Sequence, residues 1–325
     1  MRILITGVTG FVGGHLVEAL RADPSHQLHG ISRSAPSASP DSNSELALVR
    51  LHSADLLERD RIEAVVRLCE PEWVIHLAGY ANTGRSFQES EQAWRDNLHA
   101  TKQLYDAIVA SSVRPRILYV SSGLVYGDVE PPGSICDEQS PLKPTSPYAT
   151  SKAATDLLSY QYTRTHGLDI VRVRPFNQIG PRQSPDYAVA SFARQIAEIE
   201  AGRRAPVLET GDLSGYRDLC DIRDMVLAYL ALLQHGRTGE VYNAATGRSR
   251  LMRDVVQELL TLARVPIDFR EKIDPRRIGD TTFTQTSITR LRSATGWEPQ
   301  WSLRDSLESI LEYWRASTQQ LRARA

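Results

Sequence analysis

The stretch RILITGVTGFVGG, residues 2–14, decides the fold of this chain. It starts as a β-rich apolar run, and the glycine-rich segment GVTGFVG from Gly7 to Gly13 then opens a helical pattern. Glycines at this spacing allow a tight turn and a close approach of the backbone to a pyrophosphate, whose charge the helix N-terminus stabilises. The stretch therefore predicts the phosphate-binding loop of a dinucleotide-binding fold. The alternative is a plain glycine turn between a strand and a helix.

Alternating strand and helix patterns extend this prediction over the first half of the chain. The β-rich runs lie at residues 2–7, 28–32, 47–52, 73–79, 116–122 and 169–175, with helical patterns such as 11–22 and 91–111 between them. Alternation of this kind is typical of a parallel sheet with helices on both faces. We therefore expect an α/β fold built on a Rossmann-type, doubly wound parallel sheet.

The pattern becomes irregular after Pro175, where turn-rich segments separate helical runs at 188–201, 223–235, 251–264 and 303–316. We interpret this half as a smaller mixed α/β domain for the substrate. The predicted boundaries assign residues 1–174 and about 219–245 to the Rossmann domain and about 175–218 and 246–318 to the substrate domain. Residues 319–325 are expected to form a frayed basic tail.

The composition argues against several classes of function. The net charge of −1 over 325 residues gives no overall attraction to nucleic acid or to a membrane surface. No apolar run approaches the length of a membrane span, and MRILITG lacks the layout of a signal peptide. The three cysteines, Cys69, Cys136 and Cys220, form no CxxC pair, and no His/Cys/acid cluster is visible. We therefore expect reduced thiols, a cytoplasmic protein and no metal site.

Polar residues follow the second and third predicted strands. The hydroxyl of Ser32 and the guanidinium of Arg33 suit a phosphate group, whereas an acidic residue at this place would repel one. NADP(H) is therefore the preferred cofactor and NAD(H) a possible one, unless Arg33 is only a solvated charge. Asp55, after the third strand, is a candidate acceptor for the adenine amino group. A helix N-cap is an equally good local interpretation of Asp55.

The segment SPYATSK, residues 146–152, places Tyr148 one helical turn before Lys152. Such a pair is either a surface contact on a helix or part of a proton-transfer site. Carbonyl reduction needs hydride on carbon and a proton on oxygen, and a free tyrosine with a pKa of about 10 is a poor acid or base at neutral pH. A neighbouring ammonium and a charged nicotinamide would lower that pKa. Ser122, at a strand end, could hold the substrate oxygen beside Tyr148 or be a plain strand-end hydroxyl.

Motifs over essentially the whole length of the chain together resemble the extended short-chain dehydrogenase/reductase family. They are Gly7, Gly10 and Gly13; His76 to Gly79; Asn97; Ser121-Ser122 with Val125 to Gly127; Tyr148 with Lys152; and Arg174 to Asn177. The resemblance implies that Tyr148 is the catalytic acid/base, that Lys152 assists it, and that Ser122 completes the set. The implied cofactor-binding residues are Gly7, Thr9, Gly10, Phe11, Val12, Gly13, Ser32, Arg33, Asp55, Leu56, Leu77, Ala78, Gly79, Tyr148, Lys152 and Pro175.

The second half resembles the sugar-nucleotide branch of that family, and GDP-4-keto-6-deoxy-D-mannose reductases most of all. The likeness lies in RPFNQIGP (174–181), SFARQIAEIEAG (191–202), GDLSGYRDLCDIRD (211–224), GEVYNAATG (239–247) and TGWEP (295–299). It implies a sugar-nucleotide substrate, with a GDP-sugar favoured. The implied substrate-binding residues are Ser86, Ser122, Asn177, Arg194, Arg217 and Arg277. Two residues depart from the pattern: Gln178 replaces a common histidine, and Arg182 stands where a glycine is expected.

The triplet Ser122-Gly123-Leu124 argues against a dehydratase. By resemblance, the 4,6-dehydratases carry a glutamate two places after the active-site hydroxyl residue, often with an aspartate between, to move a proton at C5 and eject water from C6. Neither Gly123 nor Leu124 can transfer a proton. The resemblance thus predicts an NADPH-dependent reductase acting at the C4 keto group of a nucleotide-linked 4-keto-6-deoxyhexose. An NAD-dependent nucleotide-sugar 4-epimerase and, remotely, a non-catalytic NADP-sensing protein stay open.

Two predicted helical stretches, 86–111 and 146–166, carry apolar and Tyr-rich stripes that include Leu104, Tyr105, Ile108, Tyr160 and Tyr162. The resemblance implies that these stretches pair in a homodimer through a four-helix interface. Packing within one chain is the alternative, since both helices would also flank the sheet.

Overall fold

The structure, a computed structural model, describes residues 1–33, 46–128, 134–272 and 285–323. Its largest unit is a seven-stranded parallel sheet in the order β11-β7-β5-β4-β1-β2-β3. The strands are β1 (Arg2–Thr6), β2 (Gln27–Ser32), β3 (Val49–Ser53), β4 (Trp73–His76), β5 (Arg116–Val120), β7 (Asp169–Pro175) and β11 (Val241–Ala244). The first six match the predicted runs, and the predicted α/β fold with a Rossmann-type parallel sheet is confirmed.

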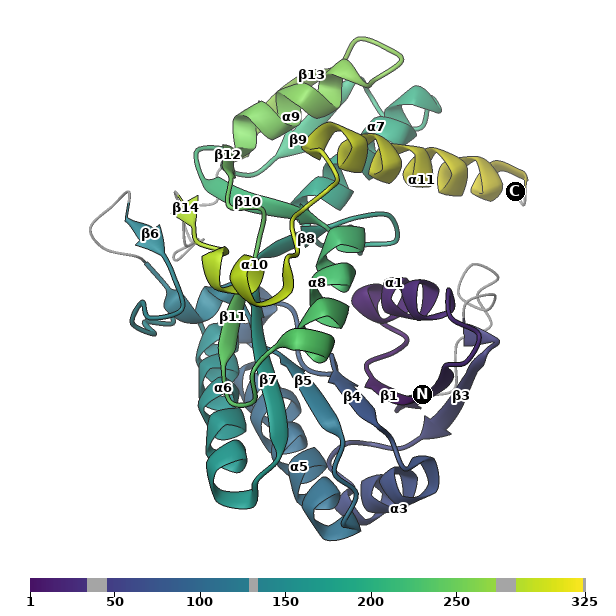
Figure 1. The fold of residues 1–325 in the computed structure, drawn as a ribbon. Helices are drawn as coiled ribbons and strands as arrows, with labels where there is room; N and C mark the ends of the chain where they lie inside the picture. The colour runs from purple at the N-terminus through teal and green to yellow at the C-terminus, as the bar shows by residue number, and fades with distance from the viewer. Residues whose placement is uncertain (34–45, 129–133, 273–284, 324–325) are drawn as a thin grey trace.

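Helices cover both faces of this sheet (Figure 1). One face carries α1 (Phe11–Leu20) and α8 (Ile222–His235), and the other carries α3 (Arg59–Cys69), α5 (Ala100–Ser111) and α6 (Pro147–His166). Side chains alternate along each strand, so Ile3 and Ile5 of β1 enter one apolar core and Leu4 enters the other. The strand order reverses between β1 and β4, and ligands of such sheets bind at that switch point, beyond the carboxyl ends of the strands.

Smaller elements stack above the seven-stranded sheet in Figure 1. A three-stranded sheet contains β8 (Asn177–Ile179), β10 (Tyr216–Asp221) and β12 (Ser249–Leu251), and β9 (Val207–Thr210) pairs with β13 (Asp268–Glu271). The helices α7 (Ala188–Glu200), α9 (Met252–Thr261) and α11 (Leu303–Ala323) enclose a third apolar core that includes Ile196, Val256 and Ile310. The expected smaller unit of mixed α/β structure is therefore present. That this unit is a substrate domain with the predicted boundaries remains a prediction.

Short elements complete the described residues. They are η1 (Arg85–Phe87), α4 (Ser90–Trp94), η2 (Arg95–His99), η3 (Gly123–Tyr126), β6 (Ile135–Cys136), β14 (Gln285–Thr286) and α10 (Thr289–Thr295). The stretch predicted as one helix over 91–111 is in fact interrupted, because the π-helical turn η2 lies between α4 and α5. Such turns often mark functional sites, and this one carries Asn97.

The prediction of a frayed tail over 319–325 is wrong for residues 319–323, which continue α11. The helix is anchored on its buried residues Leu307, Ile310 and Leu311. No glycine or proline follows them to end the helix. In the part of the chain that the structure describes, no helix is both long and apolar enough to cross a membrane.

Candidate active site

A cavity of about 1280 Å³ opens beyond the carboxyl ends of β1, β2, β4 and β5 and reaches β8 and β10. Every predicted cofactor position lines it, as do Ser122, Asn177 and Arg217. A single drug-sized ligand needs a pocket of roughly 300–1,000 Å³, so this volume suits a dinucleotide together with a second ligand. The structure thus brings residues from four strand ends and from the upper sheet to one place.

The glycine loop at the start of α1 leaves no room for side chains. Gly7 has a φ of +72°, and a Cβ there would lie 2.8 Å from the Ala78 nitrogen. A Cβ on Gly13 would lie 2.4 Å from the Val8 oxygen, so α1 packs directly against the end of β1. The N-cap residue, Gly10, provides no side-chain cap for the first N–H groups of α1. This backbone cradle fits a dinucleotide pyrophosphate, as the spacing predicts.

The ends of β2 and β3 line the part of the cavity where the sequence predicts the adenosine of the cofactor, which we call the adenosine side. The Arg33 side chain is 61% exposed, and its Nη1 lies 3.5 Å from Asp96 Oδ2. Asp96 also accepts a hydrogen bond from Arg95 Nε at 2.9 Å. Asp55 lines the cavity and accepts from the Leu57 nitrogen, while Glu58 is the N-cap of α3. Asp55 is therefore not the helix N-cap. That it contacts the adenine amino group of the cofactor remains a prediction.

The predicted catalytic residues meet where β5 ends beside the start of α6. Ser146 caps α6 by accepting from the Ala149 nitrogen at 3.2 Å, and Pro147 follows at the first helical position. This start places Tyr148 and Lys152 one turn apart on the same face of α6. Lys152 Nζ donates to the Val120 oxygen at 3.0 Å, which ties the helix to β5.

Two further contacts complete this corner. Ser122 hydrogen-bonds Tyr148 and also accepts from the Leu124 nitrogen at 3.2 Å. Asn97, carried by the π-helical turn, donates to Ser151 Oγ at 2.9 Å, next to Lys152 on α6. The hydroxyl, the phenol and the ammonium that carbonyl reduction needs are therefore adjacent.

The protonation states of the pair follow from its burial. Burial raises the pKa of Tyr148 to about 12, partly offset by the hydrogen bond between Tyr148 and Ser122. Burial lowers the pKa of Lys152 to about 8, partly offset by the charge of Asp156. In the protein alone burial dominates and raises the pKa of Tyr148, and the lowering expected from Lys152 together with a charged nicotinamide stays a prediction. At neutral pH Tyr148 is a protonated phenol, the form that can donate a proton.

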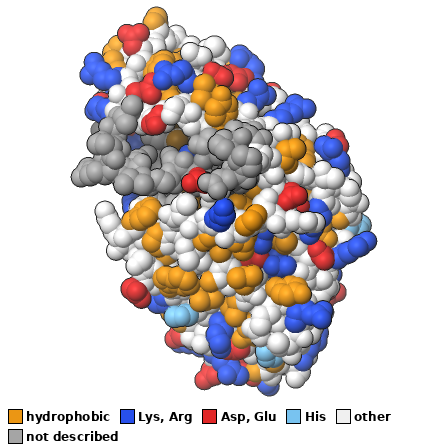
Figure 2. Space-filling view, turned by 90° about the vertical axis from the view of Figure 1, so that its left-hand side faces the viewer, with side chains coloured by type: hydrophobic (Ala, Val, Ile, Leu, Met, Phe, Trp, Pro, Cys, Tyr) orange, Lys and Arg blue, Asp and Glu red, His pale blue; other side chains and the backbone are white. Residues whose placement is uncertain are grey.

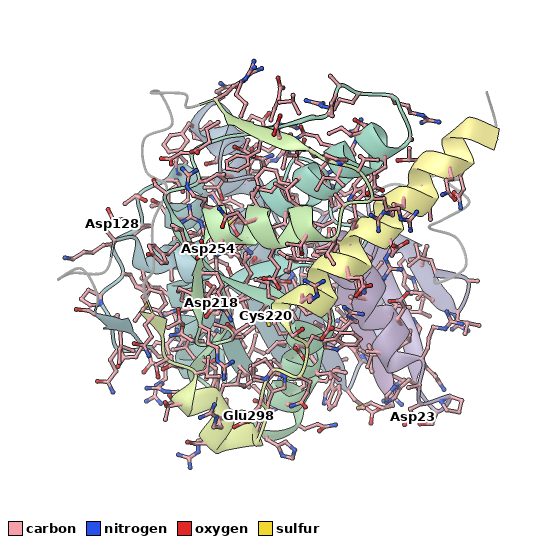
Figure 3. The ribbon with its side chains drawn as sticks, turned by 90° about the horizontal axis from the view of Figure 1, so that it is seen from above. Asp23, Asp128, Asp218, Cys220, Asp254 and Glu298 are labelled. Carbon is pink, nitrogen blue, oxygen red and sulfur yellow. The ribbon has the colours of Figure 1, made fainter. Side chains whose placement is uncertain are left out.

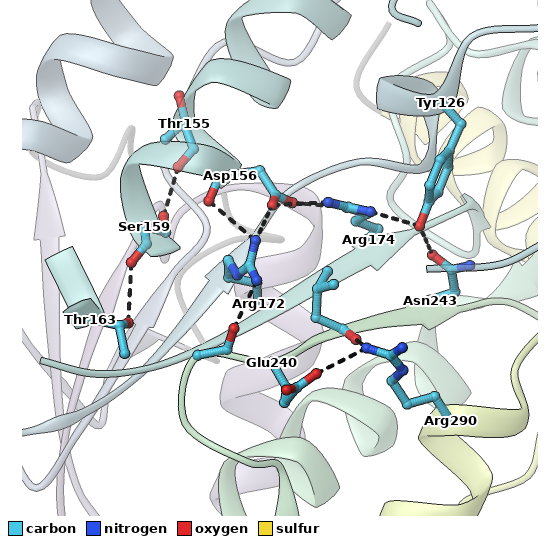
Figure 4. A network of polar contacts seen from close by, with 12 residues as sticks. Tyr126, Thr155, Asp156, Ser159, Thr163, Arg172, Arg174, Glu240, Asn243 and Arg290 are labelled. Carbon is cyan, nitrogen blue, oxygen red and sulfur yellow. Dashed lines mark hydrogen bonds and ion pairs between the residues drawn. The ribbon is translucent and has the colours of Figure 1, made fainter. Parts of the chain in front are cut away.

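A buried ionic network holds α6 in place one turn beyond Lys152 (Figure 4). Asp156 is fully buried and accepts from Arg172 Nη1 at 2.6 Å and from Arg174 Nε at 2.9 Å. Arg174 also donates to the Tyr126 hydroxyl at 2.9 Å, which in turn donates to Asn243 Oδ1 at 2.7 Å. The network joins α6 to β7, η3 and β11, so it positions the helix that carries Tyr148 and Lys152.

The far side of the cavity is built on β8 and β10. Asn177 Nδ2 donates to the Asp218 oxygen at 3.4 Å, and Arg217 Nη1 donates to the Tyr216 oxygen at 2.8 Å. The buried Asp218 carboxylate accepts from the nitrogen and the hydroxyl of Thr246, both at 2.8 Å, and lies near the centre of the molecule seen from above (Figure 3). These bonds fix β10, so the neighbouring Arg217 is held at the cavity wall.

Three predicted substrate residues are not placed in the cavity lining. Ser86 is fully buried and donates to the Thr83 oxygen at 2.6 Å. Arg194 is paired with Glu198 at 2.8 Å on α7, and its guanidinium lies 5.9 Å from the centre of the Trp314 ring. Both side chains are thus occupied elsewhere. Arg277 lies outside the residues that the structure describes.

The two sequence departures have different positions. Gln178 lines the cavity and donates to the Tyr229 hydroxyl at 3.0 Å. Arg182 adopts a φ of +71°, the left-handed conformation that explains why glycine is expected there. Its guanidinium donates to Glu18 Oε2 at 2.7 Å and to His15 Nδ1 at 2.9 Å, both on α1. Arg182 therefore braces α1 against the end of β8 and does not line the cavity.

Asp186 and Tyr187 are among the cavity-lining residues that the sequence does not reveal. Tyr187 donates its hydroxyl to the Ala81 oxygen at 3.2 Å and lies close enough to raise the pKa of Tyr148. Asp186 Oδ2 lies 3.4 Å from Arg85 Nη2. Both belong to the turn SPDY before α7, and no motif or spacing in that turn marks them.

Comparison with known proteins agrees with this geometry. The model of the NAD dependent epimerase/dehydratase family matches residues 3–245. A GDP-6-deoxy-D-mannose reductase from Pseudomonas aeruginosa is 34% identical over 316 residues, which are 97% of each chain. The solved structure of RMD from Pseudomonas aeruginosa in complex with NADPH has a TM-score of 0.83 at 33% identity and covers 97% of this chain and 100% of its own.

A second solved structure is a UDP-glucose 4-epimerase from Thermus thermophilus in complex with NAD. It has a TM-score of 0.85 at 27% identity and covers 98% of this chain and 100% of its own. The two structures share one fold but hold different cofactors, NADPH in the first and NAD in the second. Three findings lead to one assignment. They are the family match over most of the chain, the glycine cradle, and the corner formed by Ser122, Tyr148 and Lys152. This chain belongs to the NAD-dependent epimerase/dehydratase family, the extended short-chain dehydrogenase/reductases, and is one of the family's NAD(P)-dependent enzymes, the oxidoreductases and epimerases that act on sugar nucleotides.

Proposed function

We propose that this enzyme reduces the C4 keto group of a nucleotide-linked 4-keto-6-deoxyhexose, with a GDP-sugar as substrate and NADPH as cofactor. The observation that carries the proposal is the corner of Ser122, Tyr148 and Lys152 followed by Gly123 and Leu124, which bear no acid. The 34% identical GDP-6-deoxy-D-mannose reductase supports the choice of nucleotide and sugar. Asn177 and Arg217 line the far side of the cavity, where they can bind the diphosphate.

The residues of the chain carry the proton side of this reaction. When bound, the cofactor supplies the hydride to the carbonyl carbon. Ser122 holds the carbonyl oxygen beside Tyr148, whose protonated phenol donates its hydrogen to that oxygen. The Lys152 ammonium, at the same corner, stabilises the phenolate that remains. One hydride and one proton convert the ketone into the alcohol, and no further acid is needed.

Loss of water from C6 requires a different set of groups. A Cβ on Gly123 would lie 2.9 Å from the Phe176 ring, so a carboxylate side chain at this position would displace that ring. Leu124 cannot transfer a proton. Among the residues that the structure describes, five carboxylates line the cavity: Asp55, Asp96, Asp186, Glu209 and Asp212. Glu209 accepts from Lys272 and Asp212 accepts from the Ser214 nitrogen, whereas Asp186 adjoins Tyr187, close to Tyr148. Asp186 is exposed and paired with Arg85, which stabilises its charged form.

We expect no dehydration when the protein is incubated with GDP-mannose and NADP⁺. The same protein with the 4-keto-6-deoxy sugar nucleotide and NADPH should yield a product with two additional hydrogens. Mass spectrometry of the sugar nucleotide distinguishes the two reactions, and Asp186→Asn is the matched variant. Loss of one water from GDP-mannose by the wild type, abolished in Asp186→Asn, would identify Asp186 as the missing acid and overturn the reductase proposal.

Arg33→Ala should erode a preference for NADPH over NADH. A charge-assisted hydrogen bond contributes about 1.5–3 kcal/mol, which corresponds to roughly a ten- to hundredfold change in the ratio of kcat/KM for the two cofactors. The high exposure of Arg33 favours the lower end of this range. The control is Arg95→Ala, because Arg95 contacts the same Asp96 and does not line the cavity. An unchanged ratio in Arg33→Ala would show that Arg33 is only a solvated charge.

An NAD-dependent 4-epimerase is the second candidate, and Asp96 is the observation that favours it. Its carboxylate lies 3.5 Å from Arg33 and would oppose a phosphate on the adenosine ribose. The two functions differ in their use of the cofactor. A reductase consumes NADPH in step with its product, whereas an epimerase returns the hydride to the sugar and leaves the absorbance of the cofactor unchanged.

A homodimer through α5 and α6 also stays a proposal. Leu104, Tyr105 and Ile108 are fully buried in the core beneath α5, so packing within the chain explains that stripe. On α6, Leu157 and Tyr160 are 59% and 46% exposed. Hydrophobic side chains also gather on the face of the molecule shown in Figure 2, on the α6 side of Figure 1. The exposed side of α6 is therefore the part that supports a dimer.

A further inference from the structure

Three side chains that coordinate metals in other proteins converge at the β3 edge of the parallel sheet. His29 Nδ1 on β2 lies 3.0 Å from His52 Nε2 on β3, and Cys69 Sγ at the end of α3 lies 3.1 Å and 3.5 Å from these two nitrogens. His29 and Cys69 are buried, and His52 is half-buried. None of the three lines the cavity of the active site. The expectation that the chain has no His/Cys cluster is therefore wrong.

A hydrogen bond between the two imidazole nitrogens leaves the Cys69 thiol as at most a weak, secondary partner. A neutral imidazole nitrogen offers either one hydrogen or one lone pair, and a thiol is a weak donor and a weak acceptor. If His52 donates to His29, the only lone pair of His29 Nδ1 is used and the Cys69 thiol has no nitrogen acceptor left. If Cys69 donates to His29, the two imidazole nitrogens 3.0 Å apart have no hydrogen bond between them. A cation accepts one lone pair from each of the three atoms at once.

The triangle is close in size to the one that a tetrahedral zinc ion requires, though smaller. With zinc–nitrogen bonds of about 2.0–2.1 Å and a zinc–sulfur bond of about 2.3 Å, ligand atoms lie about 3.3 Å apart for two nitrogens and about 3.6 Å apart for nitrogen and sulfur. The observed separations are 3.0 Å between the two nitrogens, 3.1 Å from Cys69 Sγ to His29 and 3.5 Å from Cys69 Sγ to His52, so zinc would have to spread the three atoms by a few tenths of an ångström. We propose that His29, His52 and Cys69 form a zinc-binding site, with a water molecule or another small ligand at the fourth position.

The charge state of the cluster bears on this proposal. Burial lowers the pKa of both His29 and His52, so their imidazoles are neutral at pH 7 with lone pairs to give. Burial raises the pKa of Cys69 to about 11, so zinc must displace the thiol proton and affinity should rise with pH. Arg50 and Arg2 place positive charge near the cluster and oppose a cation. The thiolate formed on binding compensates one of the two charges of zinc.

The position of the site suggests a structural role. It links β2, β3 and α3, three elements joined otherwise by strand pairing and apolar contacts. Ser32 ends β2, and Ala54 follows β3, and both line the adenosine side of the active-site cavity. Zinc would therefore stabilise the part of the sheet that precedes the cofactor site without contacting substrate. This inference does not depend on the reaction that the enzyme catalyses.

Metal content tests the proposal. The tag-free full-length protein, first dialysed against a chelator, is equilibrated with Zn²⁺, and the bound metal is counted by elemental mass spectrometry. We expect one zinc per chain in the wild type. In His52→Ala, which removes the half-buried ligand, the affinity for zinc should fall by roughly tenfold or more. His99→Ala, at an exposed histidine outside the cluster, is the control and should bind like the wild type. Equal zinc binding by wild type and His52→Ala would overturn the proposal.

Cobalt substitution tests the thiolate ligand separately. Co²⁺ bound to a thiolate gives a sulfur-to-cobalt charge-transfer band in the near ultraviolet, which we expect in the wild type and in Cys136→Ser but not in Cys69→Ser. Cys136 is a buried free thiol outside the cluster, so it controls for unspecific thiol binding. If Cys69→Ser does not fold, the zinc-dependent rise in melting temperature of wild type against His52→Ala decides. Absence of both the band and this rise in the wild type would refute the site.

Discussion

Tyr148→Phe should lower kcat for reduction of the keto sugar by about 10²-fold or more, while the fold and the binding of NADPH stay nearly intact. In the proposed reaction the phenol donates its hydrogen to the substrate oxygen, and burial keeps this phenol protonated at neutral pH. Phenylalanine keeps the ring and its packing and removes the hydroxyl group that would donate the proton. The rate of product formation gives kcat, titration with NADPH gives the affinity for the cofactor, and thermal unfolding reports on the fold.

Tyr187→Phe is the matched control for this experiment. Tyr187 lines the same cavity, lies near Tyr148 and donates its hydroxyl to the Ala81 oxygen. Removal of its hydroxyl should change kcat by only a few-fold, because that hydroxyl is bonded to the backbone. If Tyr148→Phe turned over within a few-fold of the wild type, or if Tyr187→Phe lost more activity than Tyr148→Phe, Tyr148 would not be the proton donor.

Features encoded within a few residues could be predicted from the sequence. The loop from Gly7 to Gly13 and the pair of Tyr148 and Lys152 depend on local spacing, since a loop and a helical turn each fix the distances within them. The six predicted strands appear for the same reason, because their apolar runs have the length and flanking turns of buried strands. All of these residues then meet at the switch point of the sheet.

Features made by tertiary packing could not be predicted in this way. His29, His52 and Cys69 belong to two strands and a helix end, and only the path of the chain through β2, β3 and α3 brings their polar atoms together. Asp186 and Tyr187 reach the cavity because the turn before α7 lies over it. The direction of the Tyr148 pKa depends on how deeply the ring is enclosed, which no spacing reveals.

Asp156→Asn should destabilise the protein by about 3–5 kcal/mol, the usual cost of removing one partner from a buried ion pair. Asp156 is the shared acceptor of Arg172 and Arg174, and these three side chains are buried. Asparagine keeps the volume and one acceptor oxygen but leaves two buried guanidinium groups without a counter-charge. Equilibrium unfolding in urea measures the loss, and Glu198→Ala, which breaks the pair with Arg194 on the surface of α7, should cost less than about 1 kcal/mol.

The pH dependence and a second substitution separate charge from packing. The two arginines hold the pKa of Asp156 below its ordinary value, so its stabilising contribution is present above the pKa of an unfolded aspartate and is lost as pH falls through the lower folded value. The stability difference between wild type and Asp156→Asn should therefore be constant near neutral pH and shrink only in acid. Adding Arg172→Met to Asp156→Asn should recover part of the loss, because it deletes one of the unpaired charges. A loss below about 1 kcal/mol in Asp156→Asn, or no recovery in the double variant, would mean that apolar packing rather than this network holds α6, and with it Tyr148 and Lys152, against the sheet.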